Sequence, residues 1–306
     1  MRKDVEFKSK GTTCRAWLNT PKNGKGPFPI VVMAGGWCYV REIVMPHYSK
    51  FFEEAGLATL IFDYRGFGVS DGEPRQHVDP NMQIEDYRNA ISFVETLSEV
   101  DSERIGIWGI SMSGGYVLII GATDQRVKCI VSTIPCVDGY WNMVRSHGTE
   151  GFRRLQETII KDRRERFQTG RSGLIPMTAL DHHKTVCTWP YKETNKVFLE
   201  IQRTEAPLHQ HENTIESVEC LESYTVFPFV SRILNIPTLM LVAEGDDLTP
   251  WDLAINAFRE IPSPEKKLFI IPKTSHMALY ASKSKLQIAA KVATGWLVDH
   301  LIKPYQ

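Results

Sequence analysis

The chain has 306 residues, and its 36 Lys and Arg side chains balance its 36 Asp and Glu side chains, so the formal net charge is zero. This length suits one large α/β domain, or a core with an insertion. Without net charge, nothing attracts the chain generally to nucleic acid or to an anionic membrane, and we expect neither as a partner.

The sequence carries no signal for export, membrane insertion or a cofactor. Residues 1–10 lack an apolar stretch, and no run approaches the roughly 18 apolar residues of a membrane helix, so we expect a cytoplasmic protein. Six scattered cysteines without a CxxC pair indicate buried free thiols. No HExxH occurs, and His209 with His211 is an isolated pair, so we expect no metal and no cofactor.

The N-terminal third predicts strands that alternate with helices. Residues 5–7 and 16–18 indicate two short antiparallel strands, and residues 29–33 (PIVVM) are a continuous apolar run typical of a strand buried on both faces. A helix is expected over 46–55, which ends before Gly56, and a strand over 58–62. Residues 63–74 then predict a loop.

The same alternation continues further along the chain. Apolar residues at helical spacing predict a helix over 81–97, followed by a strand over 104–108, an apolar helix over 113–122 and a strand over 127–133. Two more strands are expected over 238–243 and 268–271, and a closing helix over 285–302. This order predicts an α/β fold with a mostly parallel sheet flanked by helices.

Residues 141–234 do not follow this alternation of strands and helices. They hold a charged helix over 152–167, with Phe152, Leu155, Ile159 and Phe167 assigned to one stripe, and irregular aromatic-rich segments. Because open α/β sheets place their sites at the carboxyl ends of the strands, we interpret 141–234 as a helical cap on a core of 1–140 and 235–306. The alternative is a separate domain with an unrelated role.

Two serines fit the pattern G-x-S-x-small, which is common by chance. Gly68 to Gly72 gives the stricter match around Ser70, and Gly109 to Ser113 surrounds Ser111. A nucleophile elbow needs a strand that runs into a sharp turn and then a helix, and Ser111 has this context whereas Ser70 does not. We therefore predict Ser111 as the nucleophile; a helix-capping serine is the alternative.

An oxyanion hole is expected beside this serine. The helix that follows Ser111 points the Met112 amide at the reacting centre, which makes it one expected donor. The second donor is expected from the loop after residues 29–33, and we assign it to the Trp37 amide just after Gly35-Gly36. Cys38 lacks the elbow and is interpreted as a buried thiol.

The base and the acid are predicted from loops after the last two strands. His276 follows the strand at 268–271 and precedes the last helix, which is where this arrangement places the base. Asp246 follows the strand at 238–243 and is the predicted acid, with Asp247 as a solvated or capping carboxylate. Asp138, after the preceding strand, stays an alternative acid.

These segments resemble one branch of the α/β-hydrolase superfamily. The stretches FDYRGFGVSDGEPR, RIGIWGISMSGG and TLMLVAEGDDLTP and the His276 loop resemble those of dienelactone-hydrolase-like and acetyl-xylan-esterase-like proteins and of fungal polyketide transferases and thiohydrolases. Within 141–234 only ENTIESVE is similar to them. Such relatives usually carry His-Gly where this chain has Gly35-Gly36, and dienelactone hydrolases use a cysteine nucleophile, so their specific activity is not implied.

The predicted chemistry is acyl transfer. Ser111 would attack an ester or thioester carbonyl, His276 would move the proton, and water would clear the acyl-enzyme. An acyltransferase, or a hydrolase of C–C bonds beside a ketone, would use the same residues; a non-catalytic binding protein is the third alternative. Whether the chain forms a homodimer stays open.

The aromatic residues of 141–234 suggest a small-molecule acyl substrate that is apolar or aromatic, although each could instead belong to that segment's own core. They are Trp141, Trp189, Tyr191, Phe198, Tyr224, Phe227 and Phe229. Arg163, Arg164 and Arg166 could attract an acidic substrate or a carrier-bound thioester, and a solvated helix face is the alternative.

Overall fold

A computed structural model describes residues 1–305 of the chain. Within them, one sheet has the strand order β1-β2-β4-β3-β5-β6-β9-β10. β1 and β2 pair antiparallel, as do β2 and β4, and the neighbours from β4 to β10 are parallel. The strands are β1 (Arg2–Ser9), β2 (Thr12–Asn19), β3 (Phe28–Ala34), β4 (Ala58–Phe62), β5 (Val100–Ile110), β6 (Val127–Thr133), β9 (Thr238–Ala243) and β10 (Lys266–Ile271). This topology confirms the α/β class with a mostly parallel sheet.

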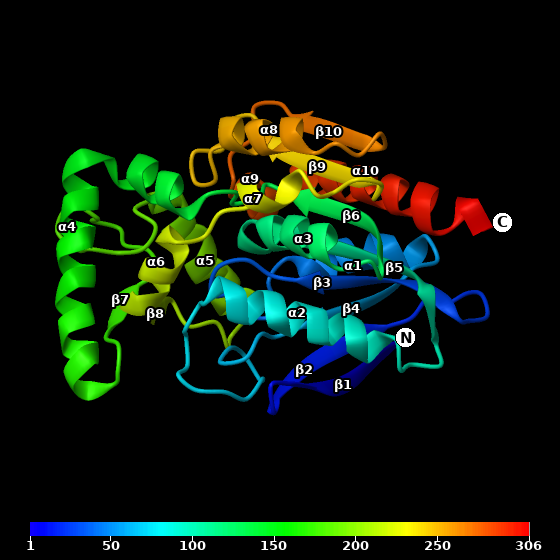
Figure 1. Ribbon diagram of the computed structural model, residues 1–306, viewed down its shortest axis with the longest axis horizontal. Coiled ribbons are helices and arrows are strands. Elements are labelled where there is room, and N and C mark those ends of the chain that lie inside the picture. The colour runs from blue at the N-terminus through cyan, green and yellow to red at the C-terminus, as the bar shows by residue number, and fades with distance from the viewer. Residues whose placement is uncertain (306) are drawn as a thin grey trace.

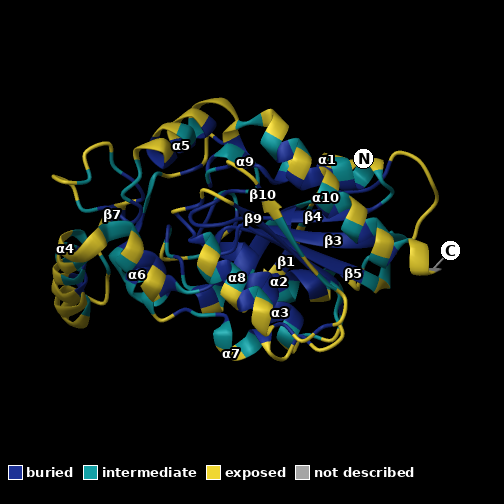
Figure 2. Ribbon diagram, turned by 90° about the horizontal axis from the view of Figure 1, so that it is seen from above, coloured by how far each residue is buried: buried dark blue, intermediate teal, exposed yellow. Residues whose placement is uncertain are grey.

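Helices cover both faces of this sheet. Figure 2 shows α1, α9 and α10 on one side of the dark blue strands and α2, α3 and α8 on the other. These helices are α1 (Met45–Glu54), α2 (Pro80–Val94), α3 (Met112–Thr123), α8 (Trp251–Glu260), α9 (Ala278–Ala281) and α10 (Lys283–Leu301), with a 3-10 turn η1 (Lys303–Tyr305) at the end. Because the central strands are covered twice, β4 and β9 are buried along their whole length.

The segment 141–234 forms a layer of its own at the end of the molecule away from both termini (Figure 1). Its elements, with the turn that enters it, are α4 (Gly139–Thr169), β7 (Leu174–Pro176), α5 (Lys192–Thr204), β8 (Glu212–Thr214), α6 (Ile215–Glu222) and α7 (Phe227–Val230). β7 and β8 pair antiparallel in a second, small sheet. α4 packs on α6, and α7 packs on α3 of the core.

The structure corrects the expected helix over 152–167. It is part of the longer α4, which kinks at Gly148, a residue with a φ of 61°. Leu155 and Ile159 are buried as expected, but Phe167 is 93% exposed and does not belong to the buried stripe. Near that end α4 packs on α6, and its last turn extends beyond α6 into solvent (Figure 1).

Several boundaries also differ from the sequence prediction. β1 extends over Arg2–Ser9 because it pairs with β2 along its full length, although its alternate side chains face solvent and leave no apolar run. β5 begins at Val100, four residues earlier than expected, because Phe28 of β3 pairs with Val100 across a bulge. α2 ends at Val94 rather than at Leu97. Within residues 1–305, every helix is too short or too polar to cross a bilayer.

Candidate active site

Ser111 occupies a sharp turn between β5 and α3. Its backbone has a φ of 59° and a ψ of −118°, a conformation that costs a non-glycine residue free energy and often accompanies function. The turn is held by the sheet, since the Ser111 amide donates to Thr133 O at 2.9 Å and Ser111 O accepts from the Cys136 amide at 3.0 Å. A Cβ on Gly109 would lie 2.2 Å from Ser113 O, so only glycine fits where strand and helix pass.

His276 and Asp246 meet beside this turn, one after β10 and one after β9. The imidazole Nδ1 lies 2.8 Å from Asp246 Oδ2, and both residues are buried. Thr249 completes the pair: its amide donates to Asp246 Oδ1 at 2.8 Å, and its hydroxyl lies 2.9 Å from Asp246 Oδ2. The carboxylate therefore fixes the imidazole with Nδ1 protonated, which leaves Nε2 as the basic nitrogen.

Ser111 and His276 line the same cavity, whose volume is about 270 Å³. No hydrogen bond of ordinary geometry joins the side chains of Ser111 and His276 within residues 1–305. In enzymes without substrate, hydrogen bonds between catalytic residues are often long or poorly aligned. Most of the lining is apolar or aromatic. The other lining residues are Trp37, Tyr39, Met177, Trp189, Thr194, Phe198, Leu248 and Met277. A carbonyl carbon in this cavity would meet the serine hydroxyl in surroundings that largely exclude water.

The two amides predicted as oxyanion donors make no hydrogen bond to protein acceptors within residues 1–305. The loop after β3 runs against the serine: a Cβ on Gly36 would lie 3.0 Å from Ser111 Cβ and 3.2 Å from Ile110 O. In the described chain, neither the Trp37 amide in this loop nor the Met112 amide at the start of α3 donates to a protein acceptor. Unpaired amides beside a strained serine are the donors that acyl transfer requires.

The loop that carries Trp37 is held in place by the segment 141–234. The indole Nε1 donates to Asn213 Oδ1 at 3.0 Å, and Asn213 Oδ1 also accepts from the Thr188 hydroxyl at 2.9 Å. The Trp37 ring meets Trp189 edge to face, with centroids 5.8 Å apart. These contacts supply the rigidity that an oxyanion loop with two consecutive glycines would otherwise lack.

His209 anchors the same loop from a second point. Its Nδ1 lies 3.0 Å from Cys38 O, so this nitrogen carries the proton, and Nε2 has no partner. Burial lowers the pKa of His209 to about 4, with His211 nearby as a further cause, so the ring is neutral near pH 7. Within residues 1–305, no acidic side chain forms an ion pair with His209.

The structure places the rival residues in other roles. The Ser70 hydroxyl donates to Asp63 O at 2.7 Å and accepts from the Arg15 amide at 2.8 Å, so it secures a loop. Asp138 caps α4 by accepting from the Trp141 amide at 2.9 Å. Cys38 is buried, and this burial raises the pKa of its thiol well above the ordinary value, which disfavours a thiolate.

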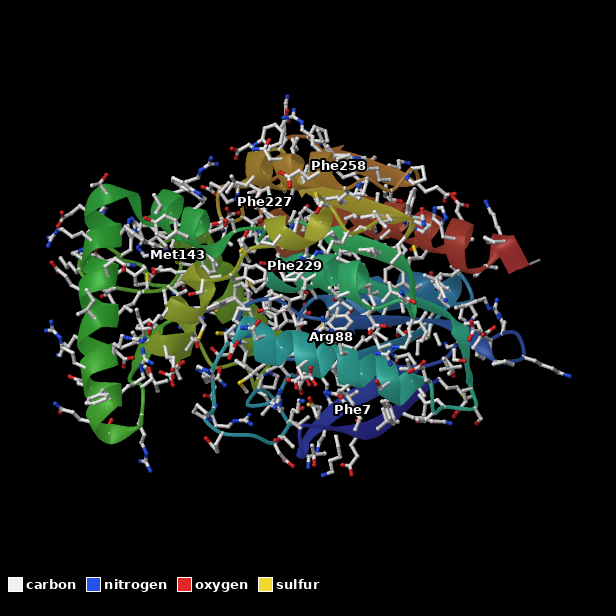
Figure 3. The ribbon with its side chains drawn as sticks, in the orientation of Figure 1. Phe7, Arg88, Met143, Phe227, Phe229 and Phe258 are labelled. Carbon is white, nitrogen blue, oxygen red and sulfur yellow. The ribbon has the colours of Figure 1, made fainter. Side chains whose placement is uncertain are left out.

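The aromatic residues expected around the substrate divide into two groups. Trp189 and Phe198 line the cavity. Phe227 and Phe229, labelled in Figure 3, come from α7, which packs on α3, and Trp141 is 52% exposed. The Tyr224 ring packs on Tyr116, and the Tyr191 hydroxyl donates to Asp247 O.

Two of the three α4 arginines singled out in the sequence, Arg163 and Arg166, have carboxylate partners. Arg166 pairs with Asp162 and Glu216, each at 2.7 Å, and Arg163 pairs with Glu219. These partners neutralise Arg163 and Arg166, whereas Arg164 is exposed and forms no ion pair within residues 1–305.

Sequence reasoning missed three supporting residues. Thr249, Asn213 and His209 act through Asp246, the Trp37 indole and Cys38 O respectively. Asn213 lies in the stretch ENTIESVE, whose resemblance to relatives was the only signal. Thr249 lies in the stretch TLMLVAEGDDLTP, three residues after Asp246, so the same resemblance was its signal. His209 carries no motif, because its partner Cys38 is far away in the chain.

Comparisons with known proteins show which family and relatives this chain resembles. The sequence profile of the family described as X-Pro dipeptidyl-peptidase (S15 family) matches residues 10–277. The acyltransferase drtE of Aspergillus calidoustus is 35% identical over 283 residues, which are 91% of this chain and 88% of the relative. The thiohydrolase aneE of Aspergillus aculeatus is 29% identical over 276 residues, 88% of this chain and 85% of the relative.

A solved structure shares the fold. The crystal structure of the alpha/beta hydrolase GrgF from Penicillium sp. sh18 superposes with a TM-score of 0.81 at 23% identity, and the match covers 98% of this chain and 99% of that one. The α/β-hydrolase fold expected from the sequence is therefore confirmed.

Proposed function

Because this chain belongs to the S15 family of α/β-hydrolases, we propose that it is a serine hydrolase that cleaves a carboxylic ester or thioester through an acyl-enzyme on Ser111. One observation carries the proposal. Ser111 holds a strained turn in the wall of a cavity that also contains His276, and His276 Nδ1 lies 2.8 Å from the buried Asp246. Relatives named as a thiohydrolase and an acyltransferase are consistent with this chemistry.

The reaction follows from the donors and acceptors present. His276 Nε2 accepts the Ser111 proton as the hydroxyl attacks the carbonyl carbon, and Asp246 stabilises the imidazolium. The oxyanion takes hydrogen bonds from the Trp37 and Met112 amides. The imidazolium then protonates the leaving alcohol or thiol. Water, deprotonated by His276, attacks the acyl-enzyme and releases the acid.

The cavity lining supports an apolar or aromatic acyl group as the substrate. Trp189 and Phe198 stand in the cavity wall together with Ser111, so residues of 141–234 would contact the acyl chain directly. In this role the segment acts as a cap over the core formed by 1–140 and 235–306. The aromatic side chains that crowd this cavity favour short acyl groups.

Labelling with a fluorophosphonate probe tests the proposal directly. The wild-type chain should be labelled, and Ser111→Ala should abolish labelling. Ser70→Ala is the matched control, because Ser70 fits the stricter sequence pattern but makes structural hydrogen bonds. Labelling that survives in Ser111→Ala would reject Ser111 as the nucleophile.

An acyltransferase is the second candidate, favoured by the relative of that name and by the largely apolar cavity. If the cavity admits water poorly, an alcohol or amine would capture the acyl group instead. Product analysis of ester turnover with and without added alcohol or amine separates transfer from hydrolysis. A hydrolase of C–C bonds beside a ketone would use the same residues and would turn over a β-diketone.

A further inference from the structure

A short core segment, residues 76–79, is tied to the start of α6. The Thr214 amide donates to Gln76 O at 3.0 Å, and the Val78 amide donates to the Ser217 hydroxyl at 2.7 Å. The segment 76–79 leads into α2 of the core, whereas α6 belongs to the segment 141–234. These hydrogen bonds fix two distant parts of the chain against each other.

This junction brings together three side chains with different metal-binding atoms. His77 and Asp79 come from the core segment, and Cys220 comes from the last turn of α6. One ligand atom from each lies within 4.8 Å of the other two, and all three residues are partly exposed. We propose that His77, Asp79 and Cys220 bind one Zn²⁺ ion, which fastens the segment 141–234 to the core at a site separate from Ser111.

Two of the ligands are already oriented by other residues. The Thr214 hydroxyl lies 2.9 Å from His77 Nδ1, and the amide of Asn81 donates to Asp79 Oδ1 at 2.8 Å as part of the α2 cap. His77 Nε2 and Asp79 Oδ2 have no protein partner within residues 1–305. Outer partners that fix the ligands in this way are typical of metal sites.

The donor set selects the kind of ion. A thiolate, an imidazole and a carboxylate suit Zn²⁺, whereas Mg²⁺ and Ca²⁺ prefer oxygen alone. Tetrahedral Zn²⁺ needs ligand atoms about 3.5 Å apart, so small side-chain rotations are enough to close the site. On binding, the Cys220 S–H bond breaks, the proton passes to solvent and a Zn–S bond forms. The thiolate and the Asp79 carboxylate then balance the charge of the ion.

An ion can reach the site from solvent. All three ligands are partly exposed, and Cys220 also lines a surface groove along α2 together with Pro80, Asn81 and Tyr224. Solvent in this groove supplies a fourth ligand. Glu216 and Glu219 lie on the same helix, but both pair with Arg166, so they leave little excess charge to compete for the ion.

The ion would also support the oxyanion loop indirectly. α6 begins immediately after β8, and Asn213 in β8 accepts the hydrogen bond from the Trp37 indole. Fastening α6 to the core therefore fixes the residue that holds Trp37. This role is structural and does not depend on the proposed hydrolase activity.

The test uses the reduced full chain after treatment with a chelator, titrated with Zn²⁺ or Co²⁺. The wild-type chain should bind one equivalent, show a thiolate-to-cobalt charge-transfer band and gain thermal stability with Zn²⁺. Cys220→Ser should lose the band and weaken Zn²⁺ binding by more than the roughly 10- to 100-fold that loss of an outer partner costs. Asp79→Asn should also weaken binding, while asparagine still caps α2.

The control variant is His183→Ala, which removes an exposed imidazole beside His182, the most obvious place for adventitious zinc. It should bind Zn²⁺ as the wild type does. Circular dichroism of each metal-free variant separates lost binding from lost folding. The proposal is overturned if the wild type binds no equivalent at micromolar Zn²⁺, or if Cys220→Ser and Asp79→Asn bind as tightly as the wild type.

Discussion

The ring of Tyr280 stacks on the imidazole of His276, with centroids 5.7 Å apart and planes inclined by 22°. Tyr280 follows His276 by one helical turn and is buried, and its hydroxyl makes no hydrogen bond of standard geometry. Burial raises the pKa of Tyr280 well above its ordinary value, and the hydroxyls of Ser111 and Tyr39 lie close enough to influence it. The phenol therefore stays neutral, and its ring restricts the orientation of the His276 imidazole.

This stack makes Tyr280 a positioning residue. Tyr280→Ala should lower kcat about 10- to 100-fold, because the imidazole gains freedom to leave its productive orientation. Tyr280→Phe keeps the ring and should retain kcat within about 3-fold. Steady-state kinetics on one ester checks both. Equal losses in the two variants would mean that the hydroxyl, and not the ring, matters.

Asp246→Asn should reduce kcat by about 10⁴-fold. An amide in place of the carboxylate holds the imidazole in the wrong tautomer, while the hydrogen-bond geometry around Thr249 survives. The rate of fluorophosphonate labelling, measured beside kcat, should fall in parallel. Asp247→Asn is the control, since that exposed side chain lies outside the pair, and it should stay near the wild type.

Gly36→Ala should lower kcat about 10²- to 10³-fold, the loss expected when one oxyanion donor is displaced. The new methyl group would lie 3.0 Å from Ser111 Cβ, so the loop with the Trp37 amide must shift. Gly295→Ala is the matched control: a methyl there meets nothing within 4 Å, and Gly295 is inside α10. That variant should keep full activity and gain about 0.5–1 kcal/mol in the free energy of unfolding.

The free energy of unfolding should contain a pH-dependent contribution from His209. The pKa of His209 in the folded chain is about 4, below the ordinary 6.5. Between these two values the imidazole is protonated in the unfolded chain but neutral in the folded chain. Stability from this residue is therefore present above pH 6.5 and is lost as the pH falls toward 4, by up to about 1.4 kcal/mol per pH unit.

His209→Asn isolates this contribution, because its amide nitrogen can still donate to Cys38 O but carries no titrating group. Urea unfolding at pH 7 and at pH 5 gives the comparison. The wild type should lose more stability than the variant between these two values. An equal loss would show that His209 titrates alike in both states.

Phe198 should limit the length of the acyl group. Its ring packs against Tyr39 with centroids 5.5 Å apart and stands in the cavity wall. Phe198→Ala should raise kcat/KM for longer acyl esters relative to short ones and should cost about 3–5 kcal/mol of stability. A panel of esters of graded length measures the shift. An unchanged ratio would place the acyl chain elsewhere.

The sequence by itself determined the order of strands and helices, because the signals for these elements lie within each short segment. The continuous apolar run 29–33 predicted a buried strand, helical spacing of apolar residues predicted α2, and high apolar content predicted α3. The strand, turn and helix around Ser111 distinguished it from Ser70 without coordinates, since an elbow is a property of neighbouring residues. For β1 the sequence predicted only residues 5–7, because the rest of that strand is held by pairing with β2 and has no apolar run.

Only the tertiary structure decided which distant residues support the site. Asn213 holds Trp37, His209 contacts Cys38 O, and Cys220 lies near His77, yet no motif links these positions. Such contacts depend on how the segment 141–234 packs on the core, and that packing is set by side-chain shape over long separations in the chain. Composition and periodicity do not predict this packing, because they describe only residues that are close together in the chain.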